Sequence, residues 1–271
     1  MAISKSEKTI YNEHVKDLKA QIDASQKKLS ELDKRKRENP RITEYYTIES
    51  ILELLKIILL NVNISDASLE ILKFKNEKAL KDARTGFFEV LKRLEQLLGD
   101  EIDRPLRENE ERLQKIEKIN PQQWLKLVQR IHYILSTLID RIGETSKWKW
   151  SFVDLLGRVA VVSKNAVNFS DVQKYRDPRT EFYYDRQELL KLAKQSLRDA
   201  AQQYRNKYEQ STKVPGDMLK SIGFLSTLRR IHILFSETEE ANKLKITIDA
   251  LRARIESDEK EQEKEKKTVK K

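Results

Sequence analysis

Two of the three histidines in the chain occur in the same Arg-Ile-His triplet, at His132 and His232. The segments around them, WLKLVQRIHYILS from Trp124 and FLSTLRRIHILFS from Phe224, align without a gap and are identical at five of thirteen positions. Histidine can exchange protons or bind a metal near neutral pH, so the repeat could mark a duplicated site. The flanking sequences differ, however, which favours two helices packed in the same phase. A histidine sharing a cavity with acidic residues would contradict this packing hypothesis.

The sequence around these histidines lacks the patterns of known catalytic and metal sites. The residues three positions before the histidines are Tyr11, Gln129 and Arg229, so the Glu-x-x-His pair of di-iron helical bundles is absent. The chain has no cysteine, no Gly-rich phosphate loop, no Gly-x-Ser-x-Gly and no His-Glu-x-x-His motif. The sequence therefore predicts no catalytic residue, no metal site, no cofactor and no small-molecule substrate, and it favours a protein that is not an enzyme.

The elements that position the histidines are predicted to be helices. Only six Gly and five Pro occur in 271 residues, which is too few for a turn-rich β protein. Apolar residues recur at steps of three and four along most of the chain, as in amphipathic helices. We expect an all-α fold, arranged as an elongated antiparallel bundle of about seven to eight helices with coiled-coil-like seams.

A heptad pattern predicts the first helix, which must end before Pro40. Its apolar stripe is typical of a coiled coil or of a long bundle helix. We expect this stripe to be the candidate surface for protein–protein contacts, and its residues are Tyr11, Val15, Leu18, Ile22, Leu29 and Leu32.

Caps and helix breakers predict the next helix boundaries. A helix covering about Thr47 to Val62 is apolar on nearly every face, so other helices must surround it. Ser65 is the expected N-cap of a new helix that ends at Gly99. Asp103 is expected to open a polar helix that runs to about Ile119.

The helix with the first Arg-Ile-His triplet is expected to start at Asn120-Pro121 and to end at Gly143. Residues 169–184 contain an Asp-Pro turn signal and are expected to be irregular. After the second triplet, Ser236 could cap a new helix or lie inside one bent helix. The predicted parts are 1–41, a heptad helix with a basic end; 42–143 and 147–255, two helical bundle parts; and 256–271, a charged tail expected to be a frayed helix or disordered.

Positive charge is the strongest feature outside the predicted core. The formal net charge is +10, and residues 145–255 carry twenty-one Lys and Arg against thirteen Asp and Glu. Alternating cations and aromatic rings can stack on single-stranded bases or lie at a lipid interface. The simpler explanations are a solvated helix end for the first cluster below and a loop anchored by tryptophan for the second. The candidate residues are Lys34, Arg35, Lys36 and Arg37, and Lys147, Trp148, Lys149 and Trp150.

The sequence predicts a cytoplasmic protein, because it lacks cysteine, a signal-peptide pattern and an apolar run long enough to span a membrane. The favoured function is that of a structural or scaffolding protein that contacts a protein partner or a second copy of itself through its helices. The alternative is nucleic-acid binding through the basic surfaces of 34–41 and 145–255. A third hypothesis is peripheral membrane association through Trp148 and Trp150.

Overall fold

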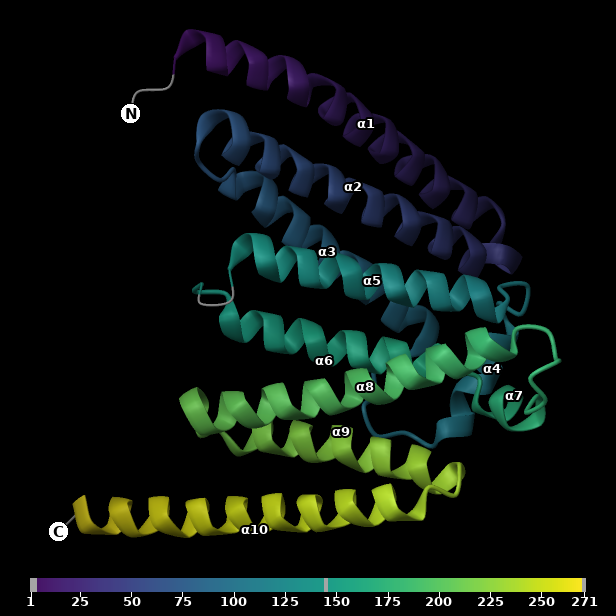
Figure 1. Ribbon diagram of the computed structural model, residues 1–271, viewed down its shortest axis with the longest axis vertical. Coiled ribbons are helices and arrows are strands. Elements are labelled where there is room, and N and C mark those ends of the chain that lie inside the picture. The colour runs from purple at the N-terminus through teal and green to yellow at the C-terminus, as the bar shows by residue number, and fades with distance from the viewer. Residues whose placement is uncertain (1–3, 144–145, 270–271) are drawn as a thin grey trace. The chain divides into compact units, whose positions relative to one another are not determined.

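The protein is all-α, as its composition and apolar periodicity predict. The computed structural model describes residues 4–143 and 146–269, and these ranges contain ten α-helices and no strand (Figure 1). The helices pack against one another through buried apolar faces. The predicted fold class is therefore confirmed.

The chain forms two compact units. Unit 1 consists of the chain up to Gly99 and of Arg112–Leu155, and unit 2 consists of Asp100–Glu111 and of the chain from Leu156 onward. The first helix thus belongs to unit 1 together with most of the predicted 42–143 part. The division falls inside helix α6, whereas the sequence places a boundary at 144–146, and residues 144–145 lie outside the described ranges.

Unit 1 is organised around one long apolar helix. Its helices are α1 (Lys5–Glu38), α2 (Thr43–Leu72), α3 (Glu77–Leu98), α5 (Pro121–Ile142) and the first part of α6 (Lys149–Asn165). The helices α1, α3 and α5 all contact α2. These neighbours surround α2, so its residues Ile51, Leu55 and Ile58 are fully buried. This burial agrees with the prediction from the apolar side chains on nearly every face of the helix.

The helix predicted to start at Ser65 starts eleven residues later. Ser65 is buried inside α2, which continues to Leu72 because Ile64 and Ala67 still face the core. Lys73 then adopts a left-handed conformation with φ of 64°, and the Asn76 side chain caps α3 by accepting a hydrogen bond from the Ala79 amide at 3.0 Å. The Ser65 prediction is therefore wrong, and the turn between α2 and α3 lies at 73–76.

The approach of α3 to α2 depends on Gly86. A Cβ atom at this position would lie 3.1 Å from Cγ1 of Ile58, which is closer than most carbon–carbon contacts in folded proteins. The absence of a side chain at Gly86 therefore lets the two helices pack at short range.

Helix α5 confirms the predicted boundaries. Asn120 and Gln123 form a reciprocal capping box at its start, and Pro121 occupies the first turn. Gly143 ends the helix with φ of 103°, a conformation that favours glycine.

The prediction of one polar helix from Asp103 to about Ile119 is wrong. Only a short turn of 3₁₀ helix (Leu106–Asn109) and helix α4 (Glu110–Gln114) form there. Backbone carbonyls just before Asp103 instead accept hydrogen bonds from a side chain of the same unit: Lys164 Nζ donates to the Glu101 and Ile102 carbonyls at 3.0 and 3.1 Å. These tertiary hydrogen bonds hold the backbone in a non-helical path.

Unit 2 contains the remaining helices. They are the second part of α6, α7 (Phe169–Lys174), α8 (Tyr183–Lys207), α9 (Pro215–Leu234) and α10 (Thr238–Val269). The stretch expected to be irregular contains the short helix α7 followed by a non-helical segment. Ser236 adopts φ of 60°, which ends α9. A new helix therefore begins after Ser236, and the alternative of one bent continuous helix is wrong.

Candidate functional site

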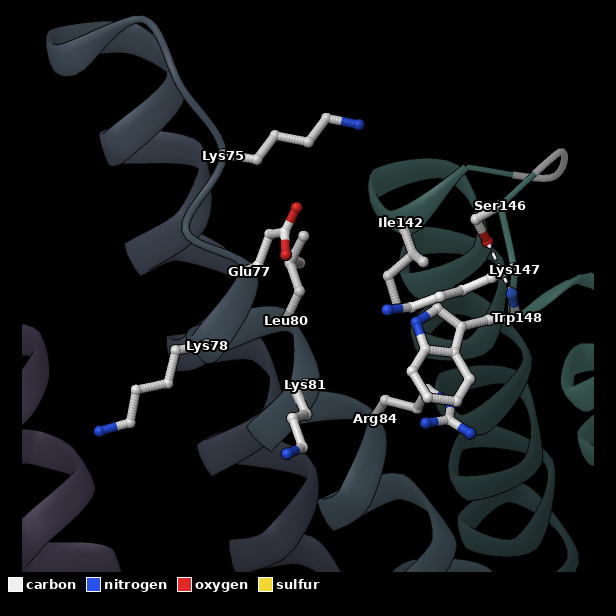
Figure 2. Close-up of a pocket in the computed structure, with 10 residues that line it drawn as sticks. All are labelled: Lys75, Glu77, Lys78, Leu80, Lys81, Arg84, Ile142, Ser146, Lys147 and Trp148. Carbon is white, nitrogen blue, oxygen red and sulfur yellow. Dashed lines mark hydrogen bonds between the residues drawn. The ribbon is translucent and has the colours of Figure 1, made fainter.

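A pocket rich in positive charge lies in unit 1, between the start of α3 and the segment that leaves the end of α5 (Figure 2). Its volume is about 480 Å³, within the range of pockets that hold small organic ligands. We call it the basic pocket. Its described lining contains five cations, one carboxylate and four other side chains: Lys75, Lys78, Lys81, Arg84 and Lys147; Glu77; and Leu80, Ile142, Ser146 and Trp148.

The first four cations follow one another at steps of three residues, at Lys75, Lys78, Lys81 and Arg84. Lys75 lies in the turn before α3, and the other three lie in the first turns of that helix. Residues three apart on a helix are neighbours on its surface, so Lys81 lies beside Arg84, whereas each step falls about 60° short of a full turn and places Lys78 on another side of α3. This spacing was the signal for the site in the sequence, and it was missed because the 65–99 stretch was interpreted only through its apolar stripe.

The cations of the basic pocket are not neutralised by neighbouring carboxylates. Among the described residues, none of the five forms an ion pair. Lys75 Nζ donates a hydrogen bond to the Arg141 backbone carbonyl at 2.9 Å, which positions the ammonium group without cancelling its charge. Figure 2 shows Lys147 reaching from the opposite side toward α3, whereas Lys78 points away from the pocket. Lys75 and Lys81 point in opposite directions along the α3 side, so the cations lie around the pocket without meeting at one point.

Arg84 and Trp148 form the base of the pocket. The guanidinium carbon of Arg84 lies 3.9 Å from the centroid of the Trp148 ring, a cation–π contact, and Nη2 donates a hydrogen bond to Ser151 Oγ at 2.9 Å. Burial lowers the pKa of Arg84, which remains a cation. Its Nε is buried without a hydrogen-bond partner among the described atoms. The contacts fix the guanidinium plane and leave part of its donor capacity unused.

Of the basic and aromatic residues predicted from the sequence, only Lys147 and Trp148 line this pocket. Lys149 instead lies over the Trp150 ring, with its ammonium 4.7 Å from the ring centroid, and both tryptophans are half-buried. The pocket thus joins one half of the predicted KWKW cluster to cations from α3.

The second predicted basic cluster, Lys34, Arg35, Lys36 and Arg37, lies at the end of α1. Lys36 pairs with Asp33 at 3.3 Å, and Lys34 lies 3.8 Å from Glu38. The thirty residues of α2 separate this cluster from Lys75, a helix length of about 45 Å at 1.5 Å per residue. The structure therefore does not bring the two basic clusters together.

The heptad stripe of α1 packs inside unit 1. Val15 and Leu32 are buried, and Tyr11, Leu18 and Ile22 pack against a cluster that contains Val15 and residues of α2 and α3. Leu29 is half-buried on the same face. Tyr11 also accepts a hydrogen bond from the Asn76 side chain at 3.1 Å. The stripe therefore meets helices of its own chain.

The two Arg-Ile-His triplets occupy different positions in their helices. His132 is half-buried in the middle of α5, in unit 1. His232 is buried near the end of α9, in unit 2, where it lines a second pocket of about 320 Å³ with Glu237. We call this the His232 pocket. Since His232 shares a cavity with a carboxylate, simple packing does not account for the second copy.

A tight turn after α9 brings Glu237 onto His232. The Ser236 amide donates to the Ile233 carbonyl at 3.0 Å, and the Glu237 amide donates to the His232 carbonyl at 2.8 Å, the two bonds of a Schellman helix end. Because an ionised carboxylate can only accept, the His232 Nδ1–H donates to Glu237 Oε2. Lys194 Nζ bonds to both Glu237 oxygens at 2.7 Å.

The electrostatics of the His232 pocket are balanced internally. Lys191 lies 3.4 Å from Glu188, Lys194 pairs with Glu237, and Arg198 lies 3.7 Å from Glu240. Burial opposes ionisation of Glu237, but hydrogen bonds from Lys194 and His232 outweigh it and hold the pKa below its ordinary value of 4.5. Each cation on this side of α8 thus has its own carboxylate.

No group of three or more metal-binding side chains lies together in the part of the chain that the structure describes. In the same part, none of the helices has the length and apolar character needed to cross a membrane.

A model of the TP0443 family matches residues 7–259, so the chain belongs to this family. No curated protein and no solved structure matches it. The family's description names no reaction or ligand.

Proposed function

We propose that this member of the TP0443 family is a non-enzymatic binding protein, and that its basic pocket binds single-stranded nucleic acid. The observation that carries the proposal is a pocket with five cations, none of them in an ion pair among the described residues, beside the half-buried indole of Trp148. Phosphate oxygens would bind the ammonium and guanidinium groups, and a base would pack against the indole.

The charge of the pocket supports this ligand. Among the described lining residues, five cations stand against one carboxylate, Glu77, which favours a positive local field. Binding of phosphates to lysines releases condensed counterions from the strand, which is the main source of affinity in such complexes. A neutral or cationic ligand would lose this contribution.

Assembly through helices and membrane association rank lower for structural reasons. The heptad stripe proposed for assembly is used inside unit 1, so a protein partner would need another face of α1. Both residues proposed as a membrane anchor, Trp148 and Trp150, are half-buried, and Arg84 covers one face of Trp148. Insertion of these rings into lipid would require them to leave their contacts.

The experiment is a salt titration of the binding of a fluorescent single-stranded oligonucleotide to the full chain. The test variant combines Lys75→Gln, Lys81→Gln and Lys147→Gln. Loss of three phosphate contacts should lower the affinity about thirtyfold, or about 2 kcal/mol at tenfold per 1.4 kcal/mol. It should also reduce the slope of log affinity against log salt by about 2, at about 0.7 per contact.

The matched control removes the same charge from an exposed face of α1, through Lys16→Gln, Lys19→Gln and Lys27→Gln. None of these three lysines belongs to the described pocket lining, so the affinity should change less than about threefold through the general field. An affinity that is independent of salt, or an equal loss in both variants, would contradict the proposal.

A further inference from the structure

An exposed phenylalanine lies in the turn between α2 and α3, next to a residue of the basic pocket. Phe74 stands between Lys73 and Lys75 in the chain, and Lys75 lines the pocket. We propose that the Phe74 ring is a second stacking surface for a single strand, so that one base packs on Trp148 and another base of the same strand packs on Phe74. This inference rests on the proposed function and extends its site beyond the described pocket lining.

The Phe74 ring is accessible to a ligand. Phe74 is 47% exposed. Among the described residues, no cation and no second aromatic ring packs on it. By contrast, the Arg84 guanidinium covers one face of Trp148 at 3.9 Å. Single exposed apolar side chains are common on protein surfaces, so the argument depends on the surroundings of this ring.

Hydrogen bonds fix the turn that carries Phe74. The hydroxyl of Ser68, which is buried in α2, donates to the Phe74 carbonyl at 2.9 Å. The Asn76 side chain caps α3 and also donates to the Tyr11 hydroxyl of α1 at 3.1 Å. The backbone on either side of the ring is therefore tied to neighbouring helices. A ring on an ordered backbone loses less conformational entropy when it binds a ligand.

Two ammonium groups flank the ring along the chain. Lys73 Nζ donates to the Glu70 carbonyl at 2.8 Å, and Lys75 Nζ donates to the Arg141 carbonyl at 2.9 Å. Figure 2 shows Lys75 extending from the turn toward the α5 side of the pocket. Both acceptors are neutral, and neither lysine forms an ion pair among the described residues. An aromatic ring beside unpaired cations is the combination that binds single strands without sequence preference.

A strand fits this surface better than a membrane does. About half of Phe74 is covered by the chain itself. Stacking of a base needs only one accessible face of the ring, whereas insertion into lipid buries an apolar side chain together with its apolar neighbours. The neighbours of Phe74 in the turn are the two lysines. These charged residues match the phosphates of a strand.

The test measures the binding of two fluorescent strands to the full chain at several salt concentrations. One is a single-stranded DNA, and the other is an abasic strand of the same length, which has the phosphodiester backbone without bases. Phe74→Ala should weaken binding of the DNA about tenfold, or about 1.4 kcal/mol, as expected for one base stacked on an aromatic ring. Binding of the abasic strand and the slope of log affinity against log salt should stay unchanged, because no phosphate contact is lost.

Three further variants make the test specific to the ring. Phe74→Tyr keeps the ring and should keep the affinity for DNA. Phe74→Leu removes the ring, keeps an apolar side chain and should weaken binding about fivefold, which gives a second measurement if Phe74→Ala is unstable in urea unfolding. Tyr133→Ala is the matched control, because Tyr133 is 62% exposed on α5 and does not belong to the described pocket lining. It should change the affinity less than about twofold.

The outcomes separate this inference from the proposed function. Equal affinity of Phe74→Ala and the unaltered protein for DNA would overturn the inference and leave the proposed function standing. An equal loss on the DNA and on the abasic strand, or a tenfold loss in Phe74→Tyr, would also overturn the inference, since neither result comes from stacking on the ring. If the unaltered protein binds neither strand, including the case in which it binds only vesicles that contain phosphatidic acid, both the inference and the proposed function are wrong.

Discussion

The basic pocket of unit 1 and the His232 pocket of unit 2 contain similar residues in different electrostatic states. Each takes several cations from one face of a helix, α3 in the first pocket and α8 in the second. In unit 2, the cations Lys191, Lys194 and Arg198 all face carboxylates at 2.7 to 3.7 Å. In unit 1, the five cations of the lining have no such partners among the described residues.

The comparison shows that composition alone does not identify an anion site. The block with the larger positive excess, 145–255, contains the pocket whose charges are paired, whereas most cations of the basic pocket come from outside that block. Paired charges contribute to the stability of the fold, and unpaired charges remain available to a ligand. This distinction leads to five predictions.

The largest effect is expected for Glu237→Ala, which should lower the free energy of unfolding by about 2 kcal/mol. The substitution leaves Lys194 and the buried His232 without their shared acceptor. The measurement is urea unfolding followed by circular dichroism. Glu239→Ala is the control, because Glu239 is 83% exposed in its pair with Lys243 and should change stability by less than about 0.5 kcal/mol.

The stability difference between the unaltered protein and Glu237→Ala should depend on pH. Since the pKa of Glu237 in the folded protein is below 4.5, its ionised form stabilises the fold above pH 4.5, and this contribution is lost as the pH falls through the folded-state pKa. The difference in stability between the unaltered protein and Glu237→Ala should therefore narrow below pH 4.5. A constant difference down to pH 3 would show that the carboxylate charge is not its source.

A smaller effect is expected from removing two cations in each pocket. Lys194→Gln with Arg198→Gln should lower the unfolding free energy by about 1.5 kcal/mol, because Glu237 loses Lys194 and Glu240 loses Arg198, and each carboxylate keeps one other partner. Lys81→Gln with Lys147→Gln removes the same charge and should change stability by less than about 0.5 kcal/mol. Equal losses in urea unfolding would remove the contrast between the two pockets.

Arg84→Lys should lower the unfolding free energy by about 1 kcal/mol. Lysine cannot reproduce both the contact with the Trp148 ring and the hydrogen bond to Ser151. Tryptophan fluorescence should change at the same time, because the indole loses the cation that covers it. If both the stability and the emission spectrum stay as in the unaltered protein, the base of the pocket is not held by Arg84.

The smallest effect is expected for Glu77→Gln, which removes the one carboxylate among the described residues of the pocket lining. The affinity for a single-stranded oligonucleotide should rise about twofold, because repulsion between exposed charges in water is weak. Glu31→Gln on the exposed face of α1 removes the same charge elsewhere and should leave the affinity nearly unchanged. A decrease in affinity for Glu77→Gln would mean that this carboxylate contacts the ligand favourably.

The helices that could be predicted from the sequence are those with local signals. Asn120, Pro121 and Gly143 define α5 through interactions within a few residues, and the prediction was confirmed. The start of α3 was predicted wrongly because Ser65 resembles a cap in the sequence, whereas burial of Ile64 and Ser65 extends α2 past it. Tertiary burial therefore decided a boundary that local propensity left open.

The candidate site was predictable only in part. Lys147 and Trp148 were recognised as a cation beside an aromatic ring. Their neighbours Lys81 and Arg84 come from a segment more than sixty residues earlier, and only the fold shows that the two segments meet. The pairing of Glu237 with His232 was also hidden, because it depends on a left-handed residue at Ser236 that the sequence does not specify.

Gly86 has a consequence for how much variation this surface can accept. A methyl group at this position would lie 3.1 Å from Ile58 Cγ1, so either the Ile58 side chain or α3 would have to shift by a few tenths of an ångström, and Arg84 lies only two residues away. A change that adds no charge and touches no ligand could therefore alter the spacing of the cations. In a scan of every position of α3, substitutions at Gly86 should be tolerated poorly, although the position carries no functional group of its own.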